Sequence, residues 1–443
     1  MYSRESKAVA VLCLLVGMLA FAFGAIWNGF PLLLHDSGSY ILDGFTGDYI
    51  AVRTVAYSLF VYYTSLFGTS VWHVILLQSL MLSFVFWRIQ TEVFGYQSPW
   101  KICLNSLCAS LLFGGTWIES QITADAMTPI VILSFLLLLL PTKESKANRL
   151  LIGLIFFVSC LCHFSHLPIL TIAYLSVCLL SVPSKTRVAR LRLKGAGLML
   201  AGAWLLAPLV NAAFSGHLKP VEAYQPHLLG RLAETGVLGR LLTEHCQETK
   251  YLFCPYWPPK SLSAKDMIWD EDGLIPKTLG HTDNPAYAQM IRDSIRHYPG
   301  MLLVAELKST ALQLYRTKFG DRLYSYASQP WVETVIRKCI PHEYVNFRSA
   351  RQQMGSLSFA WPNLLLLLSL FASALIFGDR TFRAQLSLAS SATWSVIFVA
   401  LCVVVNATVC ASTSLVADRY QARVTWILPA LLLPFYFESR KKT

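Results

Sequence analysis

Apolar residues fall in long uninterrupted blocks along this chain, without the alternation of half-buried strands or the spacing of amphipathic helices. The first block runs from Ala8 to Leu34 and carries no charged residue. Such blocks predict membrane-spanning helices, because a helix needs about 20 apolar residues to cross the hydrocarbon core. No small-x-small cleavage site follows the first block, so we expect it to stay in the mature chain. The predicted spans are 8–27, 70–88, 102–118, 127–141, 150–164, 167–182, 195–213, 359–377, 387–410 and 422–437.

The charged residues between these blocks sort to two sides. With ten spans and both termini in the cytoplasm, every short loop rich in Lys and Arg falls on the cytoplasmic side, as the positive-inside rule requires. An eleventh span within 54–69 would place the basic loops on both sides of the membrane. We therefore expect an interfacial or re-entrant helix at 53–68, in a first outer loop over 28–69. The outer side receives an acidic set: Asp36, Asp43, Asp48, Glu119, Asp125 and Asp418.

The pattern predicts an all-α polytopic membrane protein in three parts. An N-terminal membrane domain occupies 1–213, a mainly helical extracytoplasmic insert occupies 214–358, and a C-terminal membrane part of about three spans occupies 359–443. Within the insert, the sequence predicts helices over 284–299 and 301–319. The second is the more apolar, and we expect it to lie along the membrane interface.

Composition agrees with this class of protein and bears on the partners. Of 443 residues, 55% are hydrophobic and 14% are charged, and the formal net charge is +12. Most of that positive charge is explained by cytoplasmic loops that face anionic lipid. The basic balance therefore does not predict a nucleic-acid partner.

Two of the eleven cysteines suggest a covalent link in the insert. Cys246 and Cys254 lie eight residues apart in the outer insert, where an oxidising compartment would let them pair. Cys339 and Cys410 are also expected near the outer side, which leaves other pairings open. Seven others fall within or at the ends of predicted spans, where a thiol packs as a small hydrophobe.

Polar residues gather at the outer ends of the predicted spans. Asp36 stands in LLHDSGSYI just after the first apolar block, and Asp125 stands in TADAMTP before a later one. Ionisable groups at a membrane boundary are candidates for function. All of these residues can lie at one depth although they come from separate parts of the sequence: Asp36, Arg53, Glu119, Asp125, His163, His166, Arg419, Tyr420 and Arg423.

This arrangement resembles the GT-C superfamily of membrane glycosyltransferases, which includes protein O-mannosyltransferases and lipid A aminoarabinose transferases. Asp36 matches the catalytic aspartate of the first outer loop, and Asp125 matches a second acidic residue in the next outer loop. Arg419-Tyr420, followed by Pro429, matches an Arg-Tyr pair before a proline-bearing last span. The chain departs from the family in having a single aspartate at Asp36 and a mid-chain insert.

The resemblance implies an enzyme with Asp36 and Asp125 as catalytic residues. Its donor would be a sugar on a polyprenyl phosphate, and its acceptor would be a hydroxyl of a lipid, glycan or protein. It would lie in the bacterial inner membrane with the site facing the periplasm.

The chemistry of such a reaction suits these residue types. The leaving group is a lipid phosphate that needs neutralising cations, and the acceptor hydroxyl needs a base. We therefore expect Asp36 to act as the base. The substrate-binding candidates are Arg419, Arg423, Tyr420, Arg53, His163, His166 and Glu119. If a divalent metal (Mg, Mn or Zn) takes part, its candidate ligands are Asp36, Asp125 and His166.

Simpler interpretations of these residues stay open. Asp36 and Asp125 could serve only as helix starts, because aspartate is favourable there. Arg419 and Arg423 could anchor a helix to headgroups, and the two histidines could be hydrogen-bonded turn residues. At the level of function, a lipid or polysaccharide transporter or flippase, a membrane polysaccharide polymerase and an acyltransferase are the alternatives.

Overall fold

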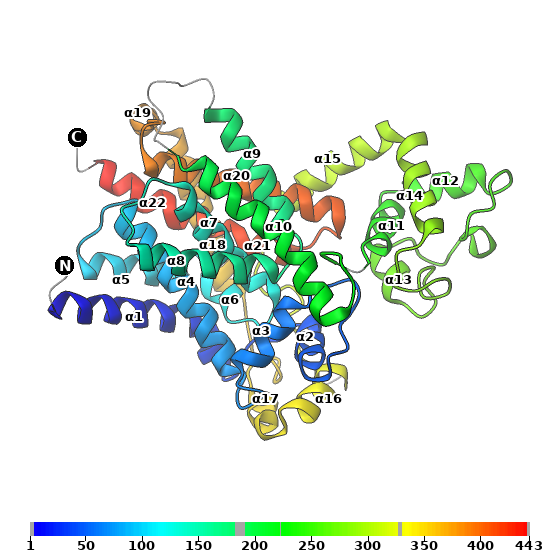
Figure 1. Cartoon of the computed structure of the whole chain (residues 1–443), viewed down its shortest axis with the longest axis horizontal. Coiled ribbons are helices and arrows are strands. Elements are labelled where there is room, and N and C mark those ends of the chain that lie inside the picture. Colours follow the sequence, from blue (N-terminus) through cyan, green and yellow to red (C-terminus); the bar gives the residue numbers. More distant parts are fainter. Residues whose placement is uncertain (1–3, 182–190, 222, 327–329, 441–443) are drawn as a thin grey trace.

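The computed structural model describes residues 4–181, 191–221, 223–326 and 330–440, and within them the chain is helical without a strand (Figure 1). Helical segments occupy each predicted span. They are α1 (Arg4–Asn28), α4 (Trp72–Glu92), α5 (Pro99–Leu107) with α6 (Gly115–Glu119), α7 (Met127–Leu139), α8 (Lys146–Leu161), α9 (His166–Ser181), α10 (Leu193–Ser215), α18 (Ala360–Gly378), α20 (Ser391–Thr413), and α21 (Asp418–Thr425) with α22 (Ile427–Arg440).

Five of these helices are long and apolar enough to cross a membrane: Ala8–Asn28 within α1, then α4, α10, α18 and α20. The predicted span 102–118 contains a π-helical turn at Cys108–Leu112 and is interrupted at Gly114, which has a left-handed backbone (φ 88°). The span 422–437 is divided between α21 and α22. The structure thus confirms an all-helical protein with several helices of membrane length, while the number ten stays a prediction.

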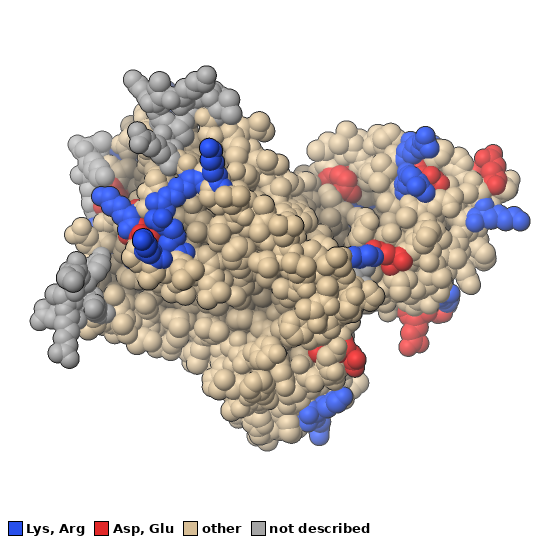
Figure 2. Space-filling model, viewed as in Figure 1, with Lys and Arg blue, Asp and Glu red and all other residues tan. Residues whose placement is uncertain are grey.

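The outer surfaces of these helices are apolar. Leu15 of α1 is 44% exposed, Leu198 of α10 is 75% exposed, and Leu367 of α18 is 63% exposed. Apolar surface of this extent is unfavourable in water and suits contact with lipid. On the face in view, Figure 2 shows a broad band without Lys, Arg, Asp or Glu between the charged side chains on the side of the chain ends and those on the side of the insert.

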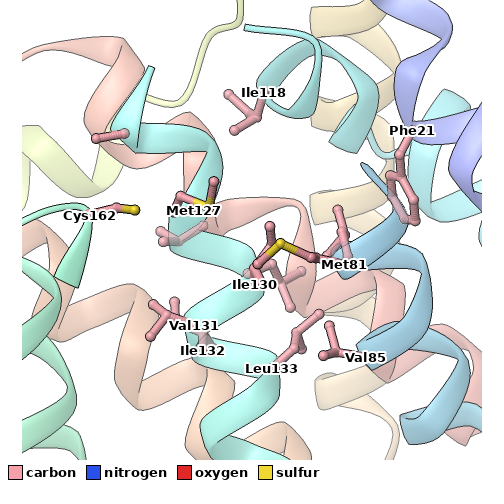
Figure 3. Close-up of a cluster of buried hydrophobic side chains, with 14 of the residues drawn as sticks. Phe21, Met81, Val85, Ile118, Met127, Ile130, Val131, Ile132, Leu133 and Cys162 are labelled. Atoms are coloured by element: carbon pink, nitrogen blue, oxygen red, sulfur yellow. The ribbon is translucent and has the colours of Figure 1, made fainter. Parts of the chain in front are cut away.

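The core of the helical body is centred on α7. Almost every side chain of α7 is buried, including Ile130, Val131 and Leu133 (Figure 3). A helix that is apolar on all sides is expected in the interior. α7 packs against α4, α8, α10, α20 and α21. Its N-terminal end therefore holds Asp125 at the centre of the end of the body that the sequence predicts to face outwards.

The segment 28–69, the predicted first outer loop, contains two short helices, α2 (His35–Thr46) and α3 (Ala56–Thr64). α3 has nine residues and rises about 14 Å at 1.5 Å per residue. It is too short to cross a hydrocarbon core of about 30 Å. The structure thus places a short helix where the sequence left a choice between an eleventh span and an interfacial helix.

The insert begins with a helical lobe that has its own hydrophobic core. Its helices are α11 (Gln225–Glu234), α12 (Val237–His245), α13 (Ala264–Trp269) and α14 (Pro285–His297). A disulfide joins Cys246 at the end of α12 to Cys254, with 5.6 Å between the Cα atoms. Asn284 caps α14 by accepting a hydrogen bond from the Ala286 N–H, and Pro285 supplies the first turn.

The rest of the insert returns to the helical body. α15 (Pro299–Tyr315) packs against α20 and keeps an exposed apolar face that includes Leu303 and Leu307. Its location along a membrane interface stays a prediction. α16 (Pro330–Cys339) packs against α2, and α17 (Tyr344–Ser349) follows it. The insert therefore flanks the predicted outer end of the body from two sides (Figure 1).

Candidate functional site

Backbone pairing brings the first two predicted outer loops together. The Leu32 N–H donates to the Ser120 carbonyl at 2.9 Å, and the Ile122 N–H donates to the Leu32 carbonyl at 3.0 Å. Ser37 extends this link, because its hydroxyl donates to the Ile122 carbonyl at 2.6 Å and accepts from the Leu34 N–H at 2.8 Å. This pairing fixes the start of α2 beside the start of α7.

The same contacts show what Asp36 does not do. Ser37 completes the capping arrangement at the start of α2, while the Asp36 side chain makes no cap hydrogen bond. At α7, the Thr123 hydroxyl accepts from the Asp125 N–H at 3.4 Å and so supplies the cap there. Neither aspartate is needed as a capping side chain, which leaves both carboxylates free for other partners.

Asp36 is held between two arginines. Its Oδ1 lies 2.7 Å from an Nη atom of Arg53, and its Oδ2 lies 2.8 Å from an Nη atom of Arg419. Burial opposes ionisation of the Asp36 carboxyl, but the charges of Arg53 and Arg419 outweigh it, so the pKa of Asp36 lies well below its ordinary value. The three side chains are 13–20% exposed, so the cluster opens to the surface.

A second, deeper cluster contains Asp125 and Arg423. The Arg423 guanidinium is fully buried and lies 2.5 Å from Asp125 Oδ1. It also donates to Asn406 Oδ1 at 2.9 Å and to the Ser165 hydroxyl at 3.1 Å. With its donors directed to protein groups, Arg423 here holds α21 against α7 and α20, and it does not face the surface as a phosphate ligand would.

Tyr420 separates the two clusters. Its hydroxyl accepts a hydrogen bond from Arg419 at 3.0 Å, and the guanidinium carbons of Arg419 and Arg423 lie 4.8 and 5.7 Å from its ring centroid. Arg53 makes a similar contact with the ring of Tyr40 at 5.1 Å. The aromatic rings therefore fix the arginines in place through cation–π contacts.

The two candidate histidines differ in exposure and in the partners of their ring nitrogens. His166 is fully buried, with one ring nitrogen 2.9 Å from the Thr128 hydroxyl and the other 2.9 Å from the Ser159 carbonyl. It is a hydrogen-bonded residue at the start of α9. His163 is 29% exposed, and its Nε2 lies 3.8 Å from Asp125 Oδ1. His163 therefore belongs to the Asp125 cluster.

The proposed metal ligands do not form a set. Among the residues that the structure describes, no group of three His, Cys, Asp or Glu is arranged to hold a metal ion. Both oxygens of Asp36 already face arginines, and both ring nitrogens of His166 have other partners. These residues do not fit a metal site as they stand, and we derive no step through one.

Glu119 lies apart from both clusters. It is fully buried at the end of α6, and neither carboxylate oxygen has a hydrogen-bond partner within the part of the chain described. Its backbone carbonyl accepts from the Gln78 side chain at 2.5 Å. Burial without a cation favours the neutral carboxylic acid, and a neutral group is not suited to bind a phosphate.

The structure adds residues that sequence reasoning missed. Asn406 and Ser165 anchor Arg423, and an asparagine inside the apolar run VVVNATV was the available signal for the first. Arg322 adopts a left-handed backbone (φ 61°), which is uncommon outside glycine. Together with burial, Arg53 and Arg419, its charge acts on the pKa of Asp36, so it lies beside the open cluster.

Comparison of this chain with protein-family models, with curated proteins and with solved structures found no match. The interpretation of the site therefore depends on its own geometry.

Proposed function

We propose that the protein is a GT-C-type glycosyltransferase that moves a sugar from a polyprenyl-phosphate donor to an acceptor hydroxyl of a lipid, glycan or protein. The observation that carries the proposal is the open cluster of Asp36, Arg53 and Arg419, in a protein with five helices of membrane length. It combines one carboxylate with two cations in a partly exposed position. The proposed location is the bacterial inner membrane, with the cluster facing the periplasm.

Asp36 is a weak base while both arginines hold it, because they favour its ionised form. A donor phosphate is an anion that can take over the hydrogen bonds of Arg53 and Arg419. Losing these partners would move the pKa of Asp36 back towards its ordinary range or above it, since burial then dominates. In this proposal, binding of the donor makes Asp36 a better base at the moment it is needed.

The reaction is then a single displacement at the anomeric carbon. The acceptor oxygen forms a bond to that carbon as Asp36 takes its proton, and the bond from the carbon to the phosphate oxygen breaks. The electron pair of that bond leaves with the lipid phosphate, whose negative charge Arg53, Arg419 and Arg322 neutralise. Inversion at the anomeric carbon follows from one displacement. Asp125 and Arg423 act as positioning residues that hold α21 and thereby Arg419.

Substitution of Asp36 tests the proposal. Asp36→Asn keeps the size of the side chain but removes its basicity, so turnover should fall by at least about 10²-fold. The matched control is Asp48→Asn, an exposed aspartate of the same loop, which should keep turnover. The measurement is sugar transfer by the purified protein from a panel of polyprenyl-phosphate sugars, and near wild-type transfer by a folded Asp36→Asn protein would refute the assignment.

Arg419→Ala separates donor binding from the proton transfer. It removes a cation that faces the phosphate before and during the reaction, so the donor Kd should rise and turnover should fall together. Binding of polyprenyl phosphate measured by calorimetry gives the first quantity without any transfer. If the donor binds equally well to Arg419→Ala and wild type, the cluster is not the phosphate site.

A further inference from the structure

A groove on the lobe lies outside the clusters described above. It has a volume of about 310 Å³, which is within the range of small-molecule sites. It lies between the start of α11 and one face of α14. Its lining residues are Tyr224, Gln225, Ala288, Ile291, Arg292 and Ile295.

The α14 wall of the groove carries three apolar side chains, which the lobe covers only in part. Ala288, Ile291 and Ile295 recur at intervals of three and four residues and so share one face of the helix. The opposite face packs Tyr287 and Met290 into the core of the lobe. Ile291 also packs against the core of the lobe and is partly buried, whereas Ile295 is 47% exposed, so this face of α14 is open mainly at Ile295.

Arg292 places one positive charge in this apolar groove. It makes no hydrogen bond or ion pair with any other residue that the structure describes, and it is exposed. The nearby Asp283 is engaged elsewhere, because it accepts from the backbone N–H groups of Tyr224 and Gln225. An apolar groove with one unpaired guanidinium is complementary to an amphiphile that carries an anionic group.

The groove lies in a lobe that packs against helices of membrane length. α11, which starts at one wall of the groove, packs against α20. Only four residues before Tyr224, Pro220 lies against Ala207 and Val210 of α10 in a small cavity. Lipid headgroups are therefore the nearest anionic amphiphiles to this part of the lobe.

We propose that the groove binds an anionic phospholipid, with its phosphate on Arg292 and an acyl chain against Ile291 and Ile295. Such a lipid would hold the lobe to the membrane surface beside the open cluster. The proposal goes beyond the proposed glycosyl transfer and does not depend on it.

Photolabelling of the full-length protein in detergent tests the groove. The probe is a phosphatidylglycerol analogue with a diazirine on one acyl chain, and mass spectrometry locates the label. We expect label on peptides from α14 and from the start of α11. Unlabelled phosphatidylglycerol should compete, whereas phosphatidylcholine and glycerol phosphate should compete poorly, because one lacks net charge and the other lacks the chain.

Arg292→Gln should reduce labelling of these peptides about fivefold, as expected for loss of one basic contact with an anionic lipid. The matched control is Arg296→Gln, which removes an exposed arginine one turn later that does not line the groove. Ile295→Asp should also reduce labelling, and an unchanged thermal midpoint shows that each variant is folded. Equal labelling of wild type and Arg292→Gln, equal competition by phosphatidylcholine, or label absent from both peptides would overturn the proposal.

Discussion

Arg419 and Arg423 lie one helical turn apart on α21, yet they meet different environments. Arg419 is partly exposed and shares Asp36 with Arg53, whereas Arg423 is fully buried with Asp125. A buried guanidinium keeps its charge, so removal of its carboxylate partner lowers the stability of the protein. At the scale of single residues, Asp125 is therefore expected to matter for stability, and Asp36 for chemistry.

Replacing the carboxyl group by an amide should change the free energy of unfolding by very different amounts at Glu119 and at Asp125. Asp125→Asn leaves the buried charge of Arg423 without its counter-charge, so the free energy of unfolding should fall by about 3–5 kcal/mol. Glu119→Gln replaces a partnerless neutral acid by a neutral amide, so the change should be less than about 1 kcal/mol. Thermal unfolding of both variants in one detergent measures the contrast, and equal losses would contradict it.

At the scale of elements, α2 carries an acidic residue at each end. Asp36 lies in the first turn, where the helix dipole favours a negative charge, and Asp43 lies in the last turns, where it does not. Asp43 is also buried, with 4% exposure, and burial raises its pKa to about 6. The start of α2 thus favours an ionised carboxylate, whereas the surroundings of Asp43 favour the protonated acid.

The pH dependence of stability should report the titration of Asp43 near the end of α2. The pKa of Asp43 is raised in the folded state above its ordinary value of 3.8, so its contribution is fully present below about pH 4 and is lost as the pH rises through about 6. Asp43→Asn removes this loss. The variant should match wild type at pH 4 and exceed it at pH 8 by up to about 3 kcal/mol, from about 1.4 kcal/mol per pH unit.

Unfolding measured at both pH values checks this expectation. Asp48→Asn is the control, because Asp48 is exposed just beyond the end of the same helix. The charge of Asp48 adds to the raised pKa of Asp43, but less than burial does, so Asp48→Asn should show only a small gain. Gains of equal size in both variants would mean that the effect belongs to the net charge of the loop and not to burial of Asp43.

At the scale of the whole molecule, charge sorting predicts which end of the helical body faces which side. Ser145 precedes α8 in a basic loop, whereas Ser261 lies in the lobe and Phe67 follows α3. Single cysteines at Ser261 and Phe67 should react with an impermeant thiol reagent added outside intact cells. A cysteine at Ser145 should react only after the cells are opened. Reaction of Asp48→Cys and Phe67→Cys from opposite sides would support an eleventh span, because only the segment that contains α3 lies between them.

Sequence alone determined the properties that depend on local side-chain chemistry. Apolar blocks indicated helices of membrane length, and Asn284-Pro285 indicated the start of α14, because hydrophobicity and capping act within a few residues. The spacing of Cys246 and Cys254 suggested a disulfide, but other thiols left the pairing open until the lobe was folded. The π-helical turn was missed because an apolar run carries no signal for it, whereas the pair Gly114-Gly115 was an available signal for the second interruption that sequence reasoning did not use.

Only the tertiary structure decided which charges meet. Asp36 and Arg419 are 383 residues apart in sequence, and Asp125 and Arg423 are 298 residues apart. Sequence reasoning grouped these side chains at one outer end but treated both arginines alike. The pairing of Leu32 with Gln121 and the central position of α7 place Arg423 in the interior and leave Arg419 near the surface. Such differences arise because burial and ion pairing depend on packing between distant segments, which no local pattern of residues encodes.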